Sequence, residues 1–176
     1  MSNVQEFENF EITNLKLSHR LTERSDTIII SITGQLDSFN SDGFQKAMRF
    51  ITPDYKNIIF NMANCSFVAS TGIGAFVFIF KTMKEKDGKV LFAHISPKIY
   101  EVFQLLGFTS FFPFLETVQD CLKNLENDEK KKEIFPFIFK CPVCNKKLRA
   151  QKNGRFRCKG CKTIISIDSF GNIRKG

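Results

Sequence analysis

The stretch Phe67-Val68-Ala69-Ser70-Thr71-Gly72-Ile73-Gly74 decides the fold, because an extended segment changes into a helix within it. A short apolar run, Ile58-Ile59-Phe60, precedes this stretch and predicts a buried strand. The residues that follow Ser70 are rich in apolar side chains until Asp87-Gly88 supplies a stop signal. We therefore expect a helix over residues 70–86, entered directly from a strand.

The same alternation of strand and helix signals continues on both sides of this stretch. The expected segments are, in chain order, strands at 12–21 and 27–32 joined by the turn Glu23-Arg24-Ser25-Asp26, a helix capped by Asn40 or Ser41 and closed by Pro53, the strand at 58–60, the helix at 70–86, a strand at 90–95, a helix capped by Ser96, a short strand at 111–114 and a helix capped by Thr117. This order is typical of an α/β domain in which a mixed sheet packs with about four helices.

Charge is unevenly distributed along the 176 residues, whose total is +8. Residues 1–126 carry 12 Lys and Arg against 14 Asp and Glu, whereas residues 127–176 carry 14 against 4. A charged run begins at Asn127, as is typical of a solvated linker. We therefore expect an α/β domain at 1–126, a linker at 127–137 and a small basic domain at 138–176.

The N-terminus and the apolar segments predict a soluble, cytoplasmic protein without a membrane contact. Residues 1–6 lack both a basic patch and an apolar run, so they do not resemble a secretory signal. The longest nearly continuous apolar stretch, Ile73 to Phe80, is far below the roughly 18 residues that would span a bilayer.

Four of the six cysteines form two close pairs, Cys141-Pro142-Val143-Cys144 and Cys158-Lys159-Gly160-Cys161, with thirteen residues between them. Two residues between paired cysteines let a tight turn point both sulfur atoms at one metal ion. We expect a structural zinc ion, because four protein ligands leave no open position for catalysis. A thiol redox centre and a bound iron ion are the alternatives. The remaining Cys65 and Cys121 are isolated and are expected to be small buried apolar residues.

The residues around the paired cysteines resemble a zinc ribbon. Residues 147–150 and 156–157 predict the two strands of a hairpin with a turn at Asn153-Gly154, and residues 163–168 predict a third strand.

Lysines and arginines crowd this ribbon, and Phe156 lies between two arginines. Basic side chains next to an aromatic ring can hold a nucleic-acid strand by charge and stacking. The simpler interpretation is that they offset the net charge of −2 of zinc with four thiolates. A protein ligand of the ribbon is a third possibility.

Four motifs resemble a known family. They are Ile32-Thr33-Gly34-Gln35-Leu36-Asp37, residues 67–74, Ile95-Ser96-Pro97 and Leu105-Leu106-Gly107-Phe108. In this order and spacing they resemble a STAS domain of the anti-sigma-factor antagonist type, over roughly residues 12–126. The resemblance implies a regulator of transcription that captures an anti-sigma factor, a serine kinase, and so frees a sigma factor. It also implies that the kinase phosphorylates the antagonist and that a serine phosphatase reverses the modification.

The resemblance assigns roles to five residues. It makes Ser70 the phosphoacceptor, with Thr71 as the alternative acceptor. It places Asp37, Gly72 and Gly74 on the partner-binding surface together with these two hydroxyl residues.

The position of Ser70 gives a physical reason for this role. A helix N-terminus presents unpaired N–H groups and the positive end of the helix dipole, both of which favour an anion. The alternative is that Ser70 is an ordinary N-cap. This chain also has Ala69 where the family has Asp, which removes a carboxylate beside the acceptor, so a STAS scaffold that is not phosphorylated remains an alternative.

An enzyme is not expected. His19 and His94, the two histidines, each fall in a predicted strand, and no set of nucleophile, base and acid is indicated. The sequence Gly72-Ile73-Gly74 is too short to predict a nucleotide-binding loop.

Overall fold

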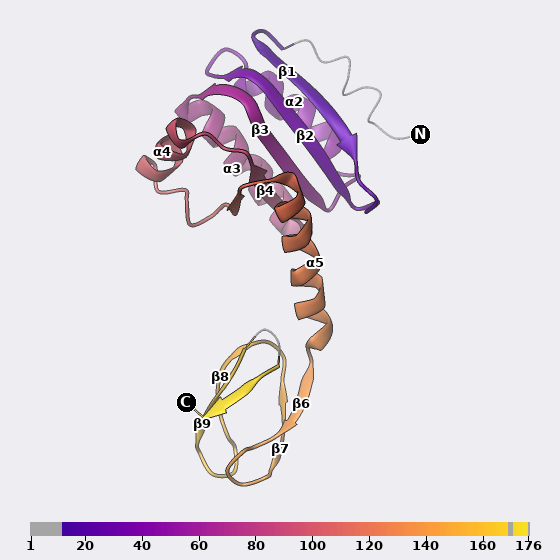
Figure 1. Ribbon diagram of the computed structural model, residues 1–176, viewed down its shortest axis with the longest axis vertical. Helices are drawn as coiled ribbons and strands as arrows, with labels where there is room; N and C mark the ends of the chain where they lie inside the picture. The colour runs from indigo at the N-terminus through magenta and orange to yellow at the C-terminus, as the bar shows by residue number, and fades with distance from the viewer. Residues whose placement is uncertain (1–11, 169–170, 176) are drawn as a thin grey trace. The chain divides into compact units, whose positions relative to one another are not determined.

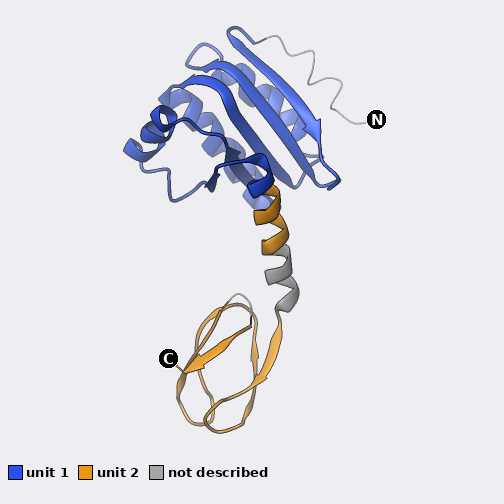
Figure 2. Ribbon diagram, in the orientation of Figure 1, with its two compact units in different colours: residues 1–121 blue, residues 122–176 orange. Residues whose placement is uncertain are grey.

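The computed structural model describes residues 12–168 and 171–175, without the side chains of residues 129–134. The chain divides into two compact units, residues 1–121 and residues 122–176 (Figure 2). The elements of the first unit are β1 (Leu15–Leu21), β2 (Thr27–Leu36), α2 (Ser41–Ile51), β3 (Asn57–Val68), α3 (Ser70–Glu85), β4 (Lys89–Ala93), α4 (Pro97–Leu105), β5 (Phe114–Leu115) and the beginning of α5 (Val118–Ile134).

The first unit is built on a mixed sheet with the strand order β1-β2-β3-β4-β5. Strand β1 pairs antiparallel with β2, and β2 to β5 run parallel to one another. Helices α2 and α3 lie side by side on one face of this sheet (Figure 1). The expected α/β fold is therefore confirmed. Because β2 to β5 are parallel, the loops that follow them meet at one edge of the sheet.

Phenylalanine rings fill the space between this sheet and α3. The ring of Phe76 lies 4.9 Å from that of Phe92 and 5.0 Å from that of Phe60, both in edge-to-face contact. Such a pair contributes about 0.5–1.5 kcal/mol beyond the burial of its area. Ile73 and Ile79 on the same helix are also fully buried. This packing holds α3 against the central strands β3 and β4 of the sheet.

Strand β3 is longer than the sequence predicts, since it spans Asn57–Val68 and not only residues 58–60. Its pairing with β4 ends at Asn61, whereas its pairing with β2 continues to Val68 with two register shifts. Beyond Asn61 the strand therefore has a neighbour on one side only. Polar residues are tolerated in this half of the strand. It therefore contains no continuous apolar run from which the sequence could predict a buried strand.

The second unit contains the short strands β6 (Phe137–Lys140), β7 (Lys147–Ala150), β8 (Gly154–Arg157), β9 (Ile164–Ile167) and β10 (Ile173–Lys175). They form two sheets, β6-β7 and β10-β9-β8. The predicted strands are present, but the prediction that 147–150 pairs with 156–157 is wrong: β7 pairs with β6, and β8 pairs with β9. Their apolar side chains pack with Cys141 and Cys158 into a small separate core.

The two units are connected through α5, which begins in the first and continues into the second. This helix extends to Ile134 and so includes most of the segment 127–137 that we expected to be a linker. The proposed domain boundaries at 126 and 138 stay predictions. Among the described residues, no helix combines the length and the apolar character needed to cross a lipid bilayer.

Candidate functional site

Ser70 is the first residue of α3 and not its N-cap. The N-cap position belongs to Ala69, whose backbone is extended (φ −81°, ψ 169°) and whose methyl group makes no capping hydrogen bond. The Ala69 N–H donates to the carbonyl oxygen of Leu36 at 2.8 Å, which ties the start of α3 to the end of β2. Ser70 and Thr71 are both exposed. The alternative that Ser70 caps the helix is therefore wrong.

The first turn of α3 lies directly on Leu36. Gly72 is buried there, and a Cβ atom at this position would come within 2.8 Å of both Leu36 Cγ and the Leu36 carbonyl oxygen. Gly74, two residues further along the helix, is exposed and has open space around it. The missing side chain of Gly72 thus permits the close contact between helix and strand, whereas Gly74 serves no such contact.

Asp37 opens a tightly bonded loop beside this turn. Its Oδ1 atom accepts a hydrogen bond from the N–H of Phe39 at 2.9 Å, and its own N–H donates to Asn40 Oδ1 at 2.9 Å. The buried Asn40 side chain also donates to the carbonyl oxygens of Thr13 and Gln35. The loop therefore presents a fixed surface at the edge of the sheet where Ser70 lies.

Two large apolar side chains are exposed on the segments that meet at this edge. Phe39, in the Asp37 loop, is 92% exposed, and Phe67, near the end of β3, is 40% exposed. We call Asp37, Phe39, Phe67, Ser70 and Thr71 the switch surface. Exposed aromatic side chains at fixed positions are typical of protein–protein interfaces. The sequence assigned no role to the side chain of Phe39 or Phe67, because nothing local distinguishes an exposed phenylalanine from a buried one.

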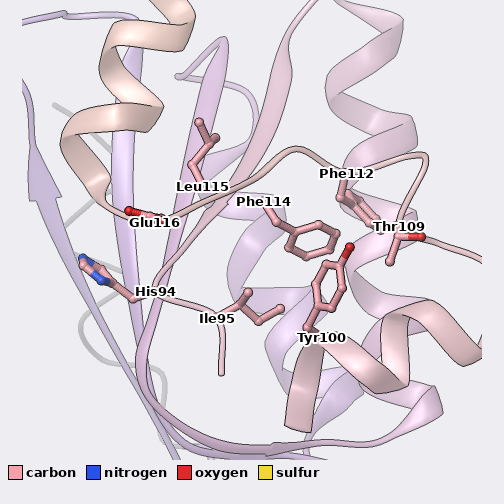
Figure 3. Close-up of a pocket in the computed structure, with 8 residues that line it drawn as sticks. All are labelled: His94, Ile95, Tyr100, Thr109, Phe112, Phe114, Leu115 and Glu116. Atoms are coloured by element: carbon pink, nitrogen blue, oxygen red, sulfur yellow. The ribbon is translucent and has the colours of Figure 1, made fainter. Parts of the chain in front are cut away.

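A pocket of about 650 Å³ lies at the loops that follow β4 and β5 (Figure 3). Its lining residues are His94, Ile95, Tyr100, Thr109, Phe112, Phe114, Leu115 and Glu116. His94 has a positive φ of 55°, and its N–H donates to the carbonyl oxygen of Glu116 at 3.2 Å. The prediction that His94 lies in a strand is wrong, since β4 ends at Ala93. The lining combines three aromatic residues with the polar His94, Thr109 and Glu116, and none of these residues was predicted from the sequence to be functional.

The four paired cysteines come together in the second unit. Their sulfur atoms all lie within 4.8 Å of one another. The Sγ atoms of Cys141 and Cys161 are 3.6 Å apart, as are those of Cys144 and Cys158. A tetrahedron with zinc–sulfur bonds of about 2.3 Å has sulfur atoms about 3.8 Å apart. The donor set and its spacing thus fit a four-coordinate thiolate metal site.

Two turns with the same hydrogen bonds build this site, and we call residues 141–146 and 158–163 the two knuckles. In each knuckle the first cysteine accepts on its sulfur from the N–H two positions later (3.5 and 3.3 Å) and on its carbonyl from the N–H four positions later (3.0 Å in both). The residues in that fourth position, Asn145 and Lys162, both have positive φ, 59° and 65°. The repeated geometry directs both pairs of sulfur atoms to one point.

The isolated cysteines are buried as neutral thiols, whereas the paired ones share hydrogen bonds with one another. Burial raises the pKa of the Cys121 thiol to about 12, and it also raises the pKa of Cys65. Among the paired cysteines, hydrogen bonding to Thr163 lowers the pKa of Cys161 to about 6, which favours the thiolate that a metal ion needs. The pKa of Cys144 is instead raised to about 11, because the hydrogen bond from the Lys146 backbone, which lowers it, is outweighed by those with the other three cysteines. Both isolated thiols are buried and stay protonated at neutral pH.

Comparison with known proteins gives the family of the first unit. Residues 19–121 match the family model described as the STAS domain, and this match covers more than half of the chain. The protein therefore belongs to the STAS domain family. Residues 138–176 match a second model, described as a domain of unknown function (DUF8512).

The chain is similar to anti-sigma factor antagonists and to part of an anion transporter. The anti-sigma F factor antagonist of Paenibacillus polymyxa is 20% identical over 114 residues, which are 64% of this chain and 97% of that protein. The structure of the anti-sigma factor antagonist SpoIIAA in its unphosphorylated form has a TM-score of 0.56 at 18% identity, over 63% of this chain and 96% of that chain. The murine solute carrier 26 family member A9 anion transporter has a TM-score of 0.54 at 17% identity, over 61% of this chain and 19% of that chain.

Proposed function

We propose that this protein is a regulator in a partner-switching pathway that controls transcription. Its STAS domain binds an anti-sigma factor serine kinase while Ser70 is unphosphorylated, and it releases the kinase when Ser70 carries a phosphate. A serine phosphatase restores the binding state. The relatives that are named anti-sigma factor antagonists support this role. The observation that carries it is the exposed Ser70 hydroxyl at the start of α3, on the same edge of the sheet as the fixed Asp37 loop.

Phosphorylation at this position changes binding without requiring a change of fold. The Ser70 side chain is exposed, so a phosphate needs no room in the core. It adds about −1.5 to −2 charge at neutral pH. The apolar Phe39 and Phe67 bind a partner by losing water, and a charge next to them opposes that loss. The N-terminus of α3 stabilises the phosphate in the free protein, because it has N–H groups without a side-chain acceptor.

We also propose that the four cysteines hold one structural zinc ion. The thiolate donors and their tetrahedral spacing support zinc, and four protein ligands leave no position for a substrate. The ion would join the two knuckles, whose small core contains few residues. Its contribution is to the stability of the second unit.

The proposed switch is tested with purified variants used as baits in a lysate of the source organism. We expect Ser70→Ala to retain a serine kinase that Ser70→Glu does not retain, as identified by mass spectrometry. Phe39→Ser should lose the kinase in either background, while Phe50→Ser, a phenylalanine of α2 that is outside the switch surface, should retain it.

Modification is then mapped with the captured kinase and ATP. Phosphate should appear on wild-type protein and on Thr71→Val but not on Ser70→Ala. If both Ser70 baits retain the same proteins, the switch is wrong and the STAS domain is a scaffold that is not phosphorylated.

A further inference from the structure

The second unit carries a high density of positive charge. Residues 138–176 contain eleven Lys and Arg against one Asp, a net charge of +10. All eleven basic side chains are exposed. None of them takes part in an ion pair between residues that the structure describes. Charge of one sign held on so small a surface destabilises the folded state by self-repulsion.

Three arginines share one face of the sheet β10-β9-β8. Arg155 on β8 and Arg174 on β10 both pair with Ser166 on β9, one from each side, so the three residues form a row across the sheet. Arg157 is two positions beyond Arg155, about 7 Å along β8, and therefore lies on the same face. We call this surface, with Ser166 and Ile164, the arginine face.

The opposite face of the same sheet forms the core of the unit. Ile165 and Ile167 on β9 are buried, and Phe156 on β8 pairs with Ile165. Successive side chains of a strand point to opposite faces, so burial of these residues directs the three arginines outward. The packing thus fixes the arginine face to a rigid support.

The charge of the metal site does not account for these arginines. A zinc ion with four thiolates has a net charge of −2. The knuckles themselves contain Lys146, Lys159 and Lys162, and the Lys146 side chain lies close to Gly160 beside the sulfur of Cys144. These three lysines already exceed the charge to be offset. The charge of the metal site therefore does not explain the arginines on the sheet.

We propose that the arginine face binds the phosphodiester backbone of a nucleic acid. The unit has four arginines, and three of them are on this face, whereas its knuckles carry lysine. The planar guanidinium group donates two parallel hydrogen bonds to a phosphate, which the lysine ammonium group cannot do. Spaced arginines on a rigid sheet match a polymer of regularly spaced phosphates.

The side chains of the arginine face also predict how the nucleic acid is recognised. Besides the arginines, the face presents Ser166 and Ile164. Among the described residues of this sheet it offers no aromatic ring for stacking on a base, because Phe156 packs against the core. Binding should therefore depend on phosphate contacts and show little preference for sequence.

The test measures binding of the full-length, zinc-loaded protein to fluorescent oligonucleotides of mixed sequence by anisotropy. Three phosphate contacts predict a slope of about −2.7 for the logarithm of affinity against that of salt, which is about a 40-fold loss between about 50 and 200 mM salt. Each single change, Arg155→Ser, Arg157→Ser or Arg174→Ser, should reduce the magnitude of the slope by about 1. Zinc content and circular dichroism verify that each variant is folded.

The matched control removes three exposed basic residues from the first unit, Lys16→Ser, Arg20→Ser and Lys81→Ser, and so lowers the net charge equally. It should retain the affinity that is lost when Arg155→Ser, Arg157→Ser and Arg174→Ser are combined in one variant. An equal loss in both variants would mean that net charge alone acts, and the proposal would be wrong.

Parallel titrations with duplex DNA, single-stranded DNA and RNA of the same length identify the natural form. Stronger binding to phosphatidylserine vesicles than to any of these would assign the face to a membrane surface instead, and no binding to any probe would also overturn the proposal. The outcome is independent of the proposed switch, because Ser70→Ala should bind the oligonucleotides as the wild type does.

Discussion

Two glycines in the first turn of α3 have opposite surroundings, although they are two positions apart. A methyl group at Gly72 would meet Leu36 Cγ and the Leu36 carbonyl oxygen at 2.8 Å, whereas a methyl group at Gly74 would meet nothing within 4 Å. The contact at Gly72 includes backbone and cannot be relieved by rotating a side chain. The position therefore admits glycine alone without movement of the helix.

We expect Gly72→Ala to lower the free energy of unfolding by about 1–3 kcal/mol, as is typical of overpacking in a core. Gly74→Ala should leave it unchanged or raise it by up to about 1 kcal/mol, because alanine favours a helix over glycine. Urea denaturation of the two variants gives both values. Equal effects would show that α3 does not contact the end of β2 as closely as described.

At the scale of elements, the start of α3 lacks the usual cap. Ala69 occupies the N-cap position, and the first turn contains no acidic residue. By comparison, α4 is capped by the Ser96 hydroxyl and α5 by the Thr117 hydroxyl. Helix α2 also has no side-chain capping bond, but it has Asp42 in its first turn, so α3 is the one of these helices with neither a side-chain cap nor a nearby carboxylate at its described start.

We expect Ala69→Asp to raise the free energy of unfolding by about 1 kcal/mol, because the carboxylate accepts from the first-turn N–H groups and interacts with the helix dipole. Ala69→Asn separates the two effects, since it supplies the acceptor without the charge. The measurement is again urea denaturation, at low and high salt. A destabilised Ala69→Asp protein would contradict the assignment of residue 69 to the N-cap.

The elements that could be predicted from the sequence are those with local signals. Ser96 with Pro97 and Thr117 mark the starts of α4 and α5 by residue type alone, and the structure confirms both caps. The pairing of β6 with β7 could not be predicted in this way, because it depends on Phe137 and Phe139 meeting Ala150 and Leu148 across a turn of the chain.

The candidate sites likewise include features with a local sequence signal and features that depend on tertiary packing. The four cysteines were predictable because metal ligation requires a fixed residue type at a fixed spacing. The sequence also indicated that Asp37 and Ser70 belong together, through a resemblance, but it could not show the Ala69–Leu36 hydrogen bond that joins their segments. Exposure of Phe39 and the pocket beside His94 result from tertiary packing, for which the sequence contains no local signal.

At the scale of the whole molecule, each unit has a core of its own. The first is a large cluster around β2, β3 and α3, whereas the second consists of a few apolar side chains packed around cysteines. A core this small stabilises little by burial alone, so the binding energy of the metal ion should be the folding energy of the second unit.

We expect the protein to bind one zinc ion and to lose the structure of the second unit when a chelator removes it. Iodoacetamide should then modify the four paired cysteines, while Cys65 and Cys121 stay unmodified because they are buried and protonated. Amide NMR spectra with and without chelator, followed by mass spectrometry of the labelled thiols, provide the measurement. Adding zinc before the label should reverse both effects, and a second unit that stays folded without metal would contradict the expectation.

The two edges of the five-stranded sheet bear on how the protein behaves at high concentration. An edge strand with free N–H and C=O groups is a template on which a second chain can add and start a fibre. Here the edge strand β5 is only two residues long, and the edge strand β1 exposes Lys16 and Arg20. A very short edge and charged side chains on an edge are both means by which natural proteins prevent such growth. The sheet that holds the switch surface is thereby protected against aggregation through its edges.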